Sequence, residues 1–136
     1  ALVETLVGDL AVGGEELRGG KTGTEEASSH INWKNKITHL SEGDTHLTLK
    51  ELAPVRLVKN KFFYDLEKLY ETGRNAEALK ETLGRARAKR GMFEGDLEEG
   101  ELEIGQVSAL IEEILPVETV FQNLLKEFKQ AGYTDF

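Results

Sequence analysis

The chain has 136 residues, a formal net charge of −8 and no cysteine. This length suffices for one domain with its own core, while the acidic balance disfavours phosphate backbones as partners and the lack of cysteine excludes disulfides, thiol catalysis and thiolate metal sites. No apolar run reaches the ~18 residues of a membrane span and the N-terminal segment has no basic region typical of a signal peptide, so we expect a soluble, cytoplasmic protein.

Residues 1–24 differ in character from the rest of the chain. Their first half is apolar and fits a short helix, a strand, or one of each, because periodicity does not separate these over so short a run. Glycines at five positions then predict a flexible loop. The apolar positions are Leu2, Val3, Leu6, Val7, Leu10 and Val12, and the glycines are Gly13, Gly14, Gly19, Gly20 and Gly23.

The stretch Gly14–Thr22 comes close to a phosphate-binding P-loop. That motif places four residues between its first glycine and a Gly-Lys pair. Here Gly14 lies one residue too far from Gly20, and Glu15 occupies the required position, where its charge would repel phosphate. We therefore expect a flexible loop without nucleotide binding.

A helix followed by two short strands is predicted next. Ser28 or Ser29 is expected to cap a helix that runs to Leu40. After a turn at Ser41–Asp44, the weak alternation of Thr45–Leu49 indicates a strand, and Val55–Val58 follows Pro54 as a second extended piece.

Two further helices are predicted before the acidic part of the chain. Phe62, Leu66, Leu69 and Tyr70 follow helical spacing, and Gly73 is a suitable C-terminal stop. Asn75 is expected to cap the following helix, which ends in a basic stretch. The stretch contains Arg85, Arg87, Lys89 and Arg90, and cations at that end favour the helix dipole.

An acidic loop follows this basic stretch. Its carboxylates do not follow the ligand rhythm of an EF-hand, which requires glycine where this chain has Glu99. We expect a solvated loop whose electrostatic partner is the basic stretch Arg85–Arg90. The acidic residues are Glu94, Asp96, Glu98, Glu99, Glu101 and Glu103.

Two amphipathic helices are predicted at the C-terminal end. The first extends over Val107–Leu115, Pro116 breaks the pattern and opens the second, and the second ends near Gly132. Their apolar positions are Val107, Leu110, Ile111, Ile114 and Leu115, then Val117, Val120, Phe121, Leu124, Leu125 and Phe128. Because helices carry most of the apolar surface, the expected fold class is mainly α with minor β.

Few side chains in the sequence are candidates for catalysis or for ligand binding. His30, His39 and His46 lack the i, i+4 spacing that places two imidazoles on one helical face, so we expect no metal site. The Gly105-Gln106-Val107-Ser108 turn begins a helix and offers amide and hydroxyl donors. Such a turn is either a plain helix cap or a site that receives an anion or the polar edge of a ring.

Three stretches together resemble a known family. They are EASSHINWK (Glu26–Lys34), APVRLVKNKF (Ala53–Phe62) and the run from Gly84 to Phe128. With them the chain, from about Glu25 to Gln130, resembles the C-terminal part of the nitronate monooxygenase (2-nitropropane dioxygenase) family, which includes the FMN-dependent enoyl reductases.

The resemblance implies the lid and C-terminal helices of an α/β (β/α)8 TIM barrel. Residues 1–24 would be a remnant of a barrel strand, residues 25–104 a helical lid, and residues 105–136 the C-terminal helices. The barrel strands that carry most of the flavin site would lie upstream of Ala1. The turn that holds the flavin phosphate in the family is not readable in residues 1–24.

The resemblance also implies roles for particular residues. Gly105, Gln106 and Ser108 match a Gly-Gln-x-(Ala/Ser) turn that lies close to the flavin and substrate cavity, so they are the expected FMN-binding residues. Arg56, Asn60 and Phe62 match an Arg-x-x-x-Asn-x-Phe element that leads into the lid. No catalytic residue is assigned, because none of the three histidines lies in the Gly-Gly-His context of the family's catalytic histidine.

The residues themselves favour plainer roles for some of these positions. Arg56 is expected to pair with carboxylates, Phe62 to lie in the core, and Trp33 to serve packing rather than stacking on a ligand.

Two functional hypotheses follow. In the first, the chain is the lid-containing segment of an FMN-dependent oxidoreductase that acts on nitronates with O2 or on enoyl thioesters with NAD(P)H. In the second, it is a non-catalytic helical module that associates with a partner. The expected partner is the missing barrel half or a second copy of the chain, and the isolated chain should bind FMN weakly or not at all.

Overall fold

The structure, a computed structural model, describes residues 23–48, 54–72, 81, 84 and 86–132. Helices dominate this part of the chain, and its one sheet has two strands, so the predicted fold class of mainly α with minor β is confirmed. The elements are α3 (Ile31–Ile37), β1 (Thr45–Thr48), β2 (Val55–Val58), α4 (Lys61–Glu71), the π-helix η1 (Lys89–Phe93), the 3-10 helix η2 (Gln106–Leu110) and α6 (Val117–Gln130).

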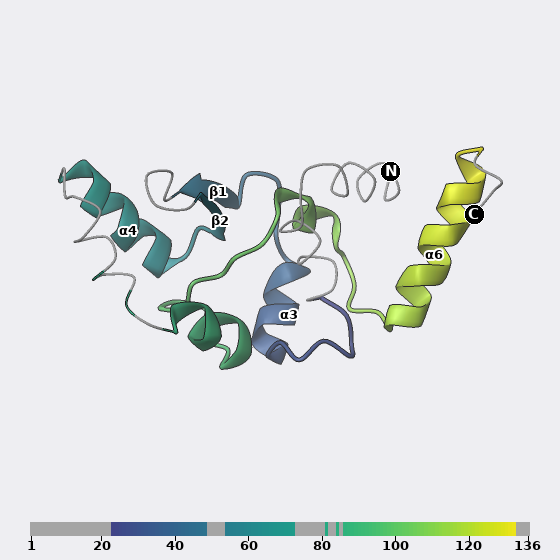
Figure 1. Cartoon of the computed structure of the whole chain (residues 1–136), viewed down its shortest axis with the longest axis horizontal. Coiled ribbons are helices and arrows are strands. Elements are labelled where there is room, and N and C mark those ends of the chain that lie inside the picture. Colours follow the sequence, from purple (N-terminus) through teal and green to yellow (C-terminus); the bar gives the residue numbers. More distant parts are fainter. Residues whose placement is uncertain (1–22, 49–53, 73–80, 82–83, 85, 133–136) are drawn as a thin grey trace.

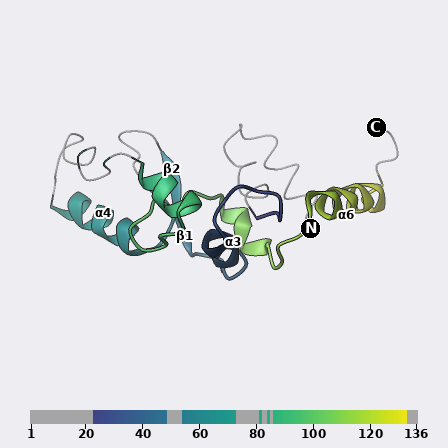
Figure 2. The same ribbon diagram turned by 90° about the horizontal axis from the view of Figure 1, so that it is seen from below.

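The molecule is elongated, with α4 near one end and α6 near the other (Figures 1 and 2). The strands and α3 lie between them, and α6 projects away from this central part. None of the described helices is long and apolar enough to cross a membrane. The predictions that concern residues 1–22, Gly73, Asn75 and Arg85 lie outside the described residues.

Helix α3 is shorter than predicted and has a different cap. Its N-cap is His30, whose Nδ1 accepts a hydrogen bond from the backbone N–H of Asn32 at 3.1 Å, so the expectation of Ser28 or Ser29 is wrong. The helix ends at Ile37, and Leu40 follows in a turn with its side chain buried. An imidazole nitrogen replaces the usual hydroxyl as acceptor because His30 directly precedes the first helical residue.

The two predicted strands form an antiparallel pair. Thr45 lies opposite Val58, and Thr48 lies opposite Val55. The predicted turn at Ser41–Asp44 is confirmed, since the N–H of Ser41 donates to Oδ2 of Asp44 at 2.8 Å.

An unpredicted segment pairs with the other edge of β2. The N–H of Val58 donates to the carbonyl of Leu102 at 2.9 Å, and the N–H of Ile104 donates to the carbonyl of Arg56 at 3.2 Å. The alternation of Leu102 and Ile104 with two glutamates is the period-two signal for this pairing. The carboxylates of this stretch mask that signal, because they predict a solvated loop.

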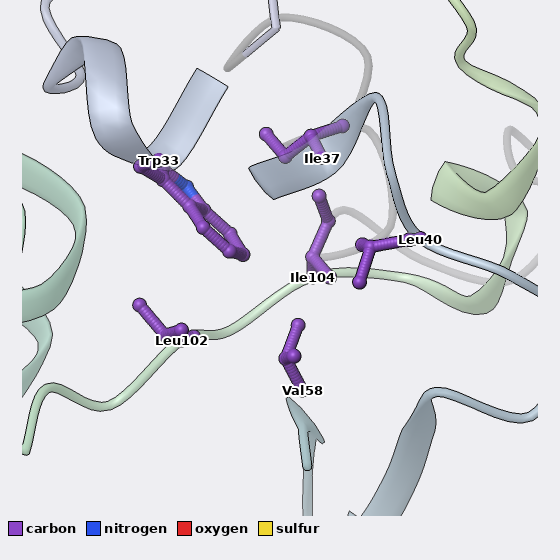
Figure 3. Close-up of a cluster of buried hydrophobic side chains, with 6 residues drawn as sticks. All are labelled: Trp33, Ile37, Leu40, Val58, Leu102 and Ile104. Atoms are coloured by element: carbon purple, nitrogen blue, oxygen red, sulfur yellow. The ribbon is translucent and has the colours of Figure 1, made fainter. Parts of the chain in front are cut away.

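The buried side chains form two clusters on opposite faces of β2. The first contains Trp33, Ile37, Leu40, Val58, Leu102 and Ile104 (Figure 3). The second contains Leu57, Phe62, Phe63 and Leu66. Because successive strand residues point to opposite faces, Leu57 and Val58 supply one cluster each. The packing roles predicted for Trp33 and Phe62 are confirmed.

The C-terminal helices differ from the prediction in two respects. The expected helix over Val107–Leu115 is only the short η2, since Ile111 has extended backbone angles (φ −87°, ψ 105°). Ile111 packs against the first cluster, so its burial in the tertiary structure outweighs the local helical periodicity. One further turn would add little stability to so short a helix. Helix α6 is present as predicted, although Pro116 occupies its N-cap rather than its first turn.

Candidate functional site

The Gly105–Ser108 turn directly follows the segment that pairs with β2. Ile104 is a member of the first cluster (Figure 3), and Gly105, the next residue, is the N-cap of η2. The position of the turn is therefore determined by the β2 hydrogen bonds and by the buried Ile104 side chain.

The three predicted flavin contacts differ in their surroundings. Ser108 is buried, and its hydroxyl donates to the carbonyl of Gly105 at 2.7 Å. Its backbone N–H donates to the same carbonyl at 3.1 Å. Gln106 is exposed, and its amide has no hydrogen-bond partner among the described residues. Ser108 thus closes the turn, while Gln106 and Gly105 are its accessible members.

Asn60 joins α4 to the acidic loop. Its Oδ1 accepts from the N–H of Phe63 at 3.0 Å and so caps α4. Its Nδ2 donates to the carbonyls of Leu97 and Gly100, both at 2.8 Å. One side chain therefore satisfies a helix end and two loop carbonyls at once. In the sequence, Asn60 stands out only through the family element, and no local pattern predicts this junction.

Arg56, from the same element, does not have the predicted partner. Its Nη1 donates to Oγ1 of Thr45 at 3.3 Å and lies 3.5 Å from the Thr45 carbonyl, and no described carboxylate pairs with it. In the β1–β2 register Arg56 lies opposite Leu47, so Thr45 is its diagonal neighbour within reach of a long side chain. Cross-strand geometry decides the partner here.

The predicted pairing between the basic stretch and the acidic loop is confirmed for the described residues. Arg87 contacts Glu99 at 3.3 Å, Lys89 contacts Glu94 at 3.2 Å, and Arg90 contacts Asp96 at 2.7 Å. The guanidinium of Arg87 also lies over the Phe62 ring, 5.1 Å from its centroid, a cation–π geometry.

Glu99 connects this stretch to the start of α4, because it pairs with Lys61 as well as with Arg87. The hydrogen bonds of Lys61 to Asp65 and to Glu99 raise its pKa to about 12. The same bond from Lys61, followed by the bond from Arg87, lowers the pKa of Glu99. The pKa of Asp96 is lowered, first by the backbone N–H of Glu99 and then by Arg90.

The pKa of Glu101 is shifted in the opposite direction to those of Asp96 and Glu99. Burial raises the pKa of its carboxyl, and the nearby Glu103 adds to the increase. Its side chain has no hydrogen-bond or ion-pair partner among the described residues.

Each of the three histidines has a structural contact of its own. His30 caps α3, Nδ1 of His39 lies 2.7 Å from the carbonyl of Asn35, and His46 contacts the edge of the Phe63 ring. Within the described part of the chain, no group of three or more histidine or carboxylate side chains is arranged to hold a metal ion.

No protein-family model and no curated protein matches this chain. Among solved structures, it is similar to FabK from Thermotoga maritima, with 32% identity and a TM-score of 0.73 over 81% of this chain and 35% of that chain. It is also similar to the M276A mutant of the same protein, with 31% identity and a TM-score of 0.62 over 80% of this chain and 32% of that chain.

The chain therefore spans about a third of the length of the FabK structures that it matches. Its fold is that of a segment of this TIM-barrel protein.

Proposed function

We propose that this chain is part of an FMN-dependent enoyl reductase-like enzyme, in which it forms the lid and the return from the lid to the barrel. The observation that carries the proposal is the similarity to FabK, at 32% identity and a TM-score of 0.73 over most of this chain. The sequence resemblance to the nitronate monooxygenase family, which includes FMN-dependent enoyl reductases, supports the same assignment independently of the fold.

The Gly105–Ser108 turn fits an edge contact with a flavin. Gln106 offers an exposed, unpartnered amide, which suits the polar edge of the ring system. Ser108 would act indirectly, because its hydroxyl is buried and donates to Gly105. The described residues offer no comparable set of donors for the phosphate, so that group would be held by the part of the fold that the chain does not span.

FMN, when bound, supplies hydride chemistry that no amino-acid side chain provides. This chain would contribute by positioning the residue that contacts the flavin and by excluding water from the site. Asn60 and the Glu99 ion pairs hold the acidic loop against α4, and the β2 pairing holds Gly105 at the end of a buried segment. Rigid support of this kind keeps a contact residue in productive geometry.

We favour an enoyl thioester, reduced with NAD(P)H, as the substrate class. The similarity to FabK supports this choice over an alkyl nitronate oxidised with O2. Both reactions are measurable on the same preparation, so the choice is open to a direct test.

The test is a chimera in which this chain replaces the matched segment of Thermotoga maritima FabK. We expect the purified chimera to be yellow with bound flavin and to oxidise NAD(P)H in the presence of an enoyl thioester. Gln106→Ala should change turnover or substrate affinity more than the matched surface substitution Glu98→Ala. Equal effects of the two substitutions would remove Gln106 from the site, and a colourless, folded chimera would contradict the proposed function.

A second candidate function is a non-catalytic helical module that binds a partner. Helix α6 favours it, because the helix has an apolar stripe and none of its residues is buried. The two candidates differ in flavin content, since a binding module would associate with its partner without retaining flavin.

A further inference from the structure

Arg56 is a partly buried cation that has no carboxylate partner among the described residues. Its Nη1 donates to Oγ1 of Thr45 at 3.3 Å and lies 3.5 Å from the carbonyl of the same residue. Both contacts are at the long end of hydrogen-bond distances, and both acceptors are neutral. The other described arginines differ from it, because Arg87 and Arg90 each pair with a carboxylate.

The guanidinium of Arg56 has donors to spare. An arginine side chain has five N–H donors and keeps its charge in proteins, and the contacts with Thr45 use Nη1 alone. Shielding a charge from water costs free energy unless the charge is paired. The chain has 25 acidic residues against 17 basic ones, yet no described carboxylate reaches this position. An anion from outside the chain would satisfy the remaining donors.

The strand pairing places Arg56 beside the turn that is the proposed flavin contact. On one side of β2, Leu47 of β1 lies opposite Arg56. On the other side, the carbonyl of Arg56 accepts from the N–H of Ile104, and Gly105 follows directly. Because opposite residues of an antiparallel pair share a face, the Arg56 side chain leaves the sheet between these two apolar side chains. Leu47 is 38% exposed and Ile104 is buried.

These surroundings suit an anion with several oxygens. Apolar neighbours limit hydration, so a hydrogen-bonded ion pair is stronger there than in bulk water. The planar fork of a guanidinium matches two oxygens of a phosphate or a carboxylate. The hydroxyl of Thr45 accepts from Arg56, and its own hydrogen has no described acceptor, so it can donate to the same anion.

The proposed reaction narrows the chemistry of that anion. NAD(P)H carries phosphates, and so do the coenzyme A and phosphopantetheine carriers of enoyl thioesters. The nicotinamide ring and the enoyl group carry no carboxylate. The FMN phosphate would be held by the part of the fold that this chain does not span. A phosphate of the hydride donor or of the thioester carrier is therefore the anion that best fits the position.

We propose that Arg56, with the Thr45 hydroxyl beside it, binds a phosphate of NAD(P)H or of the thioester carrier. This inference rests on the proposed function, because it takes the substrates from that reaction, and it deepens it by assigning a substrate-binding residue. The phosphates of both substrates are remote from the reacting carbons. The contact should therefore act on substrate affinity and not on the chemical step.

The test measures steady-state kinetics of the FabK chimera. Arg56→Gln should raise the KM for NADPH or for crotonyl-CoA by about 10–100-fold, the loss expected for a charge-assisted hydrogen bond, with little change in kcat. Arg56→Lys should restore part of the affinity, because it keeps the charge without the fork. Lys59→Gln is the matched control, since it removes the same charge from an exposed position just after β2.

A crotonyl thioester of N-acetylcysteamine, which has no phosphate, separates the two sources. If the carrier phosphate is the ligand, Arg56→Gln raises the KM for crotonyl-CoA and leaves that for the phosphate-free thioester unchanged. If NAD(P)H is the ligand, only the KM for NADPH rises, with either thioester. Unchanged KM values for NADPH and crotonyl-CoA would overturn the inference, and so would equal increases for the two thioesters.

Equilibrium binding separates this inference from the proposed function, because it requires neither flavin nor turnover. Calorimetry with NADPH and with crotonyl-CoA compares the unsubstituted chimera with Arg56→Gln. Weaker binding to Arg56→Gln in a chimera that holds no flavin would retain the phosphate site and refute the enzyme assignment. An active, flavin-containing chimera whose affinities for both ligands are unaffected by Arg56→Gln would do the reverse.

A spectroscopic readout keeps the inference testable if the Arg56→Gln chimera does not fold. In the unsubstituted chimera labelled with ¹⁵N-arginine, the bound phosphate should shift the Nε–H resonance of Arg56, which Arg56→Lys identifies by its loss. No shift of this resonance at saturating NADPH or at saturating crotonyl-CoA would overturn the inference.

Discussion

At the scale of single residues, Asn60 connects α4 with the acidic loop. It caps α4 and holds two carbonyls of the acidic loop, at Leu97 and Gly100. These partners are 37 and 40 residues away in sequence. A partly buried side chain that satisfies three backbone groups leaves all three unpaired when it is removed.

We predict that Asn60→Ala lowers the free energy of unfolding by about 2–4 kcal/mol, since a helix cap and two further hydrogen bonds are lost. Chemical denaturation followed by circular dichroism measures the change. Asn35→Ala is the control, because Asn35 is exposed on α3 and its side chain makes no described hydrogen bond. Similar losses for the two substitutions would show that the junction is unimportant.

Glu101 provides a prediction about pH. Burial raises its pKa above the ordinary value of 4.5. Between pH 4.5, the ordinary pKa, and the raised pKa of the folded state, the folded chain binds more protons than the unfolded chain. The stability of the fold therefore decreases as the pH rises through this interval. Glu101→Gln removes the buried charge, so it should raise the unfolding midpoint at pH 7 and have little benefit at pH 4.

Thermal unfolding at the two pH values measures this effect. Glu98→Gln is the matched control, because it makes the same change in net charge at an exposed position. If both substitutions raise the midpoint equally at pH 7, the gain comes from net charge and not from the burial of Glu101.

At the scale of elements, two glycines allow η1 to lie against the segment that pairs with β2. A Cβ on Gly91 would come within 2.7 Å of Cδ2 of Leu102, and a Cβ on Gly100 would overlap Cα of Gly91. The close approach of backbone to backbone is possible only without these side-chain atoms. It determines where Leu102 enters the first cluster.

We predict that Gly100→Ala destabilises the chain by at least about 3 kcal/mol, because backbone atoms must move to accept the methyl group. Gly23→Ala is the control, since a Cβ there would meet its nearest neighbours at 3.8 and 3.9 Å, which is ordinary contact. We expect the control to stay within about 1 kcal/mol of the unsubstituted chain. Denaturant midpoints report both values, and a tolerated Gly100→Ala would contradict the packing described.

At the scale of the whole molecule, the buried apolar side chains of the described residues lie in the two clusters and none of them lies in α6. Leu66 is fully buried in the second cluster, whereas no residue of α6 is buried. We therefore predict that Leu66→Ala costs about 2–5 kcal/mol and that Leu124→Ala costs less than about 1 kcal/mol in the isolated chain. Comparable losses at the two positions in urea denaturation would place α6 within the core.

The sequence by itself determined the elements whose signals are local. The helical spacing of Phe62, Leu66 and Leu69 predicted α4, and these residues also pack in or against the second cluster. The extended piece after Pro54 predicted β2, and the apolar stripe after Pro116 predicted α6. The Gly105-Gln106-Val107-Ser108 motif predicted a helix start, and the family resemblance predicted that it lies near a flavin. The start is observed at η2, and the flavin contact remains a prediction.

Only the tertiary structure decided the features that depend on distant partners. Asn60 bonds to Leu97 and Gly100, which are far away in sequence. Arg56 bonds to Thr45 across the strand pair. Helix η2 ends at Leu110, because the next residue packs against the first cluster. Local periodicity contains no information about such partners. The covering of α6 belongs to the same class, because an amphipathic pattern indicates that a helix needs a cover and only the arrangement of the other elements shows whether the described residues supply one.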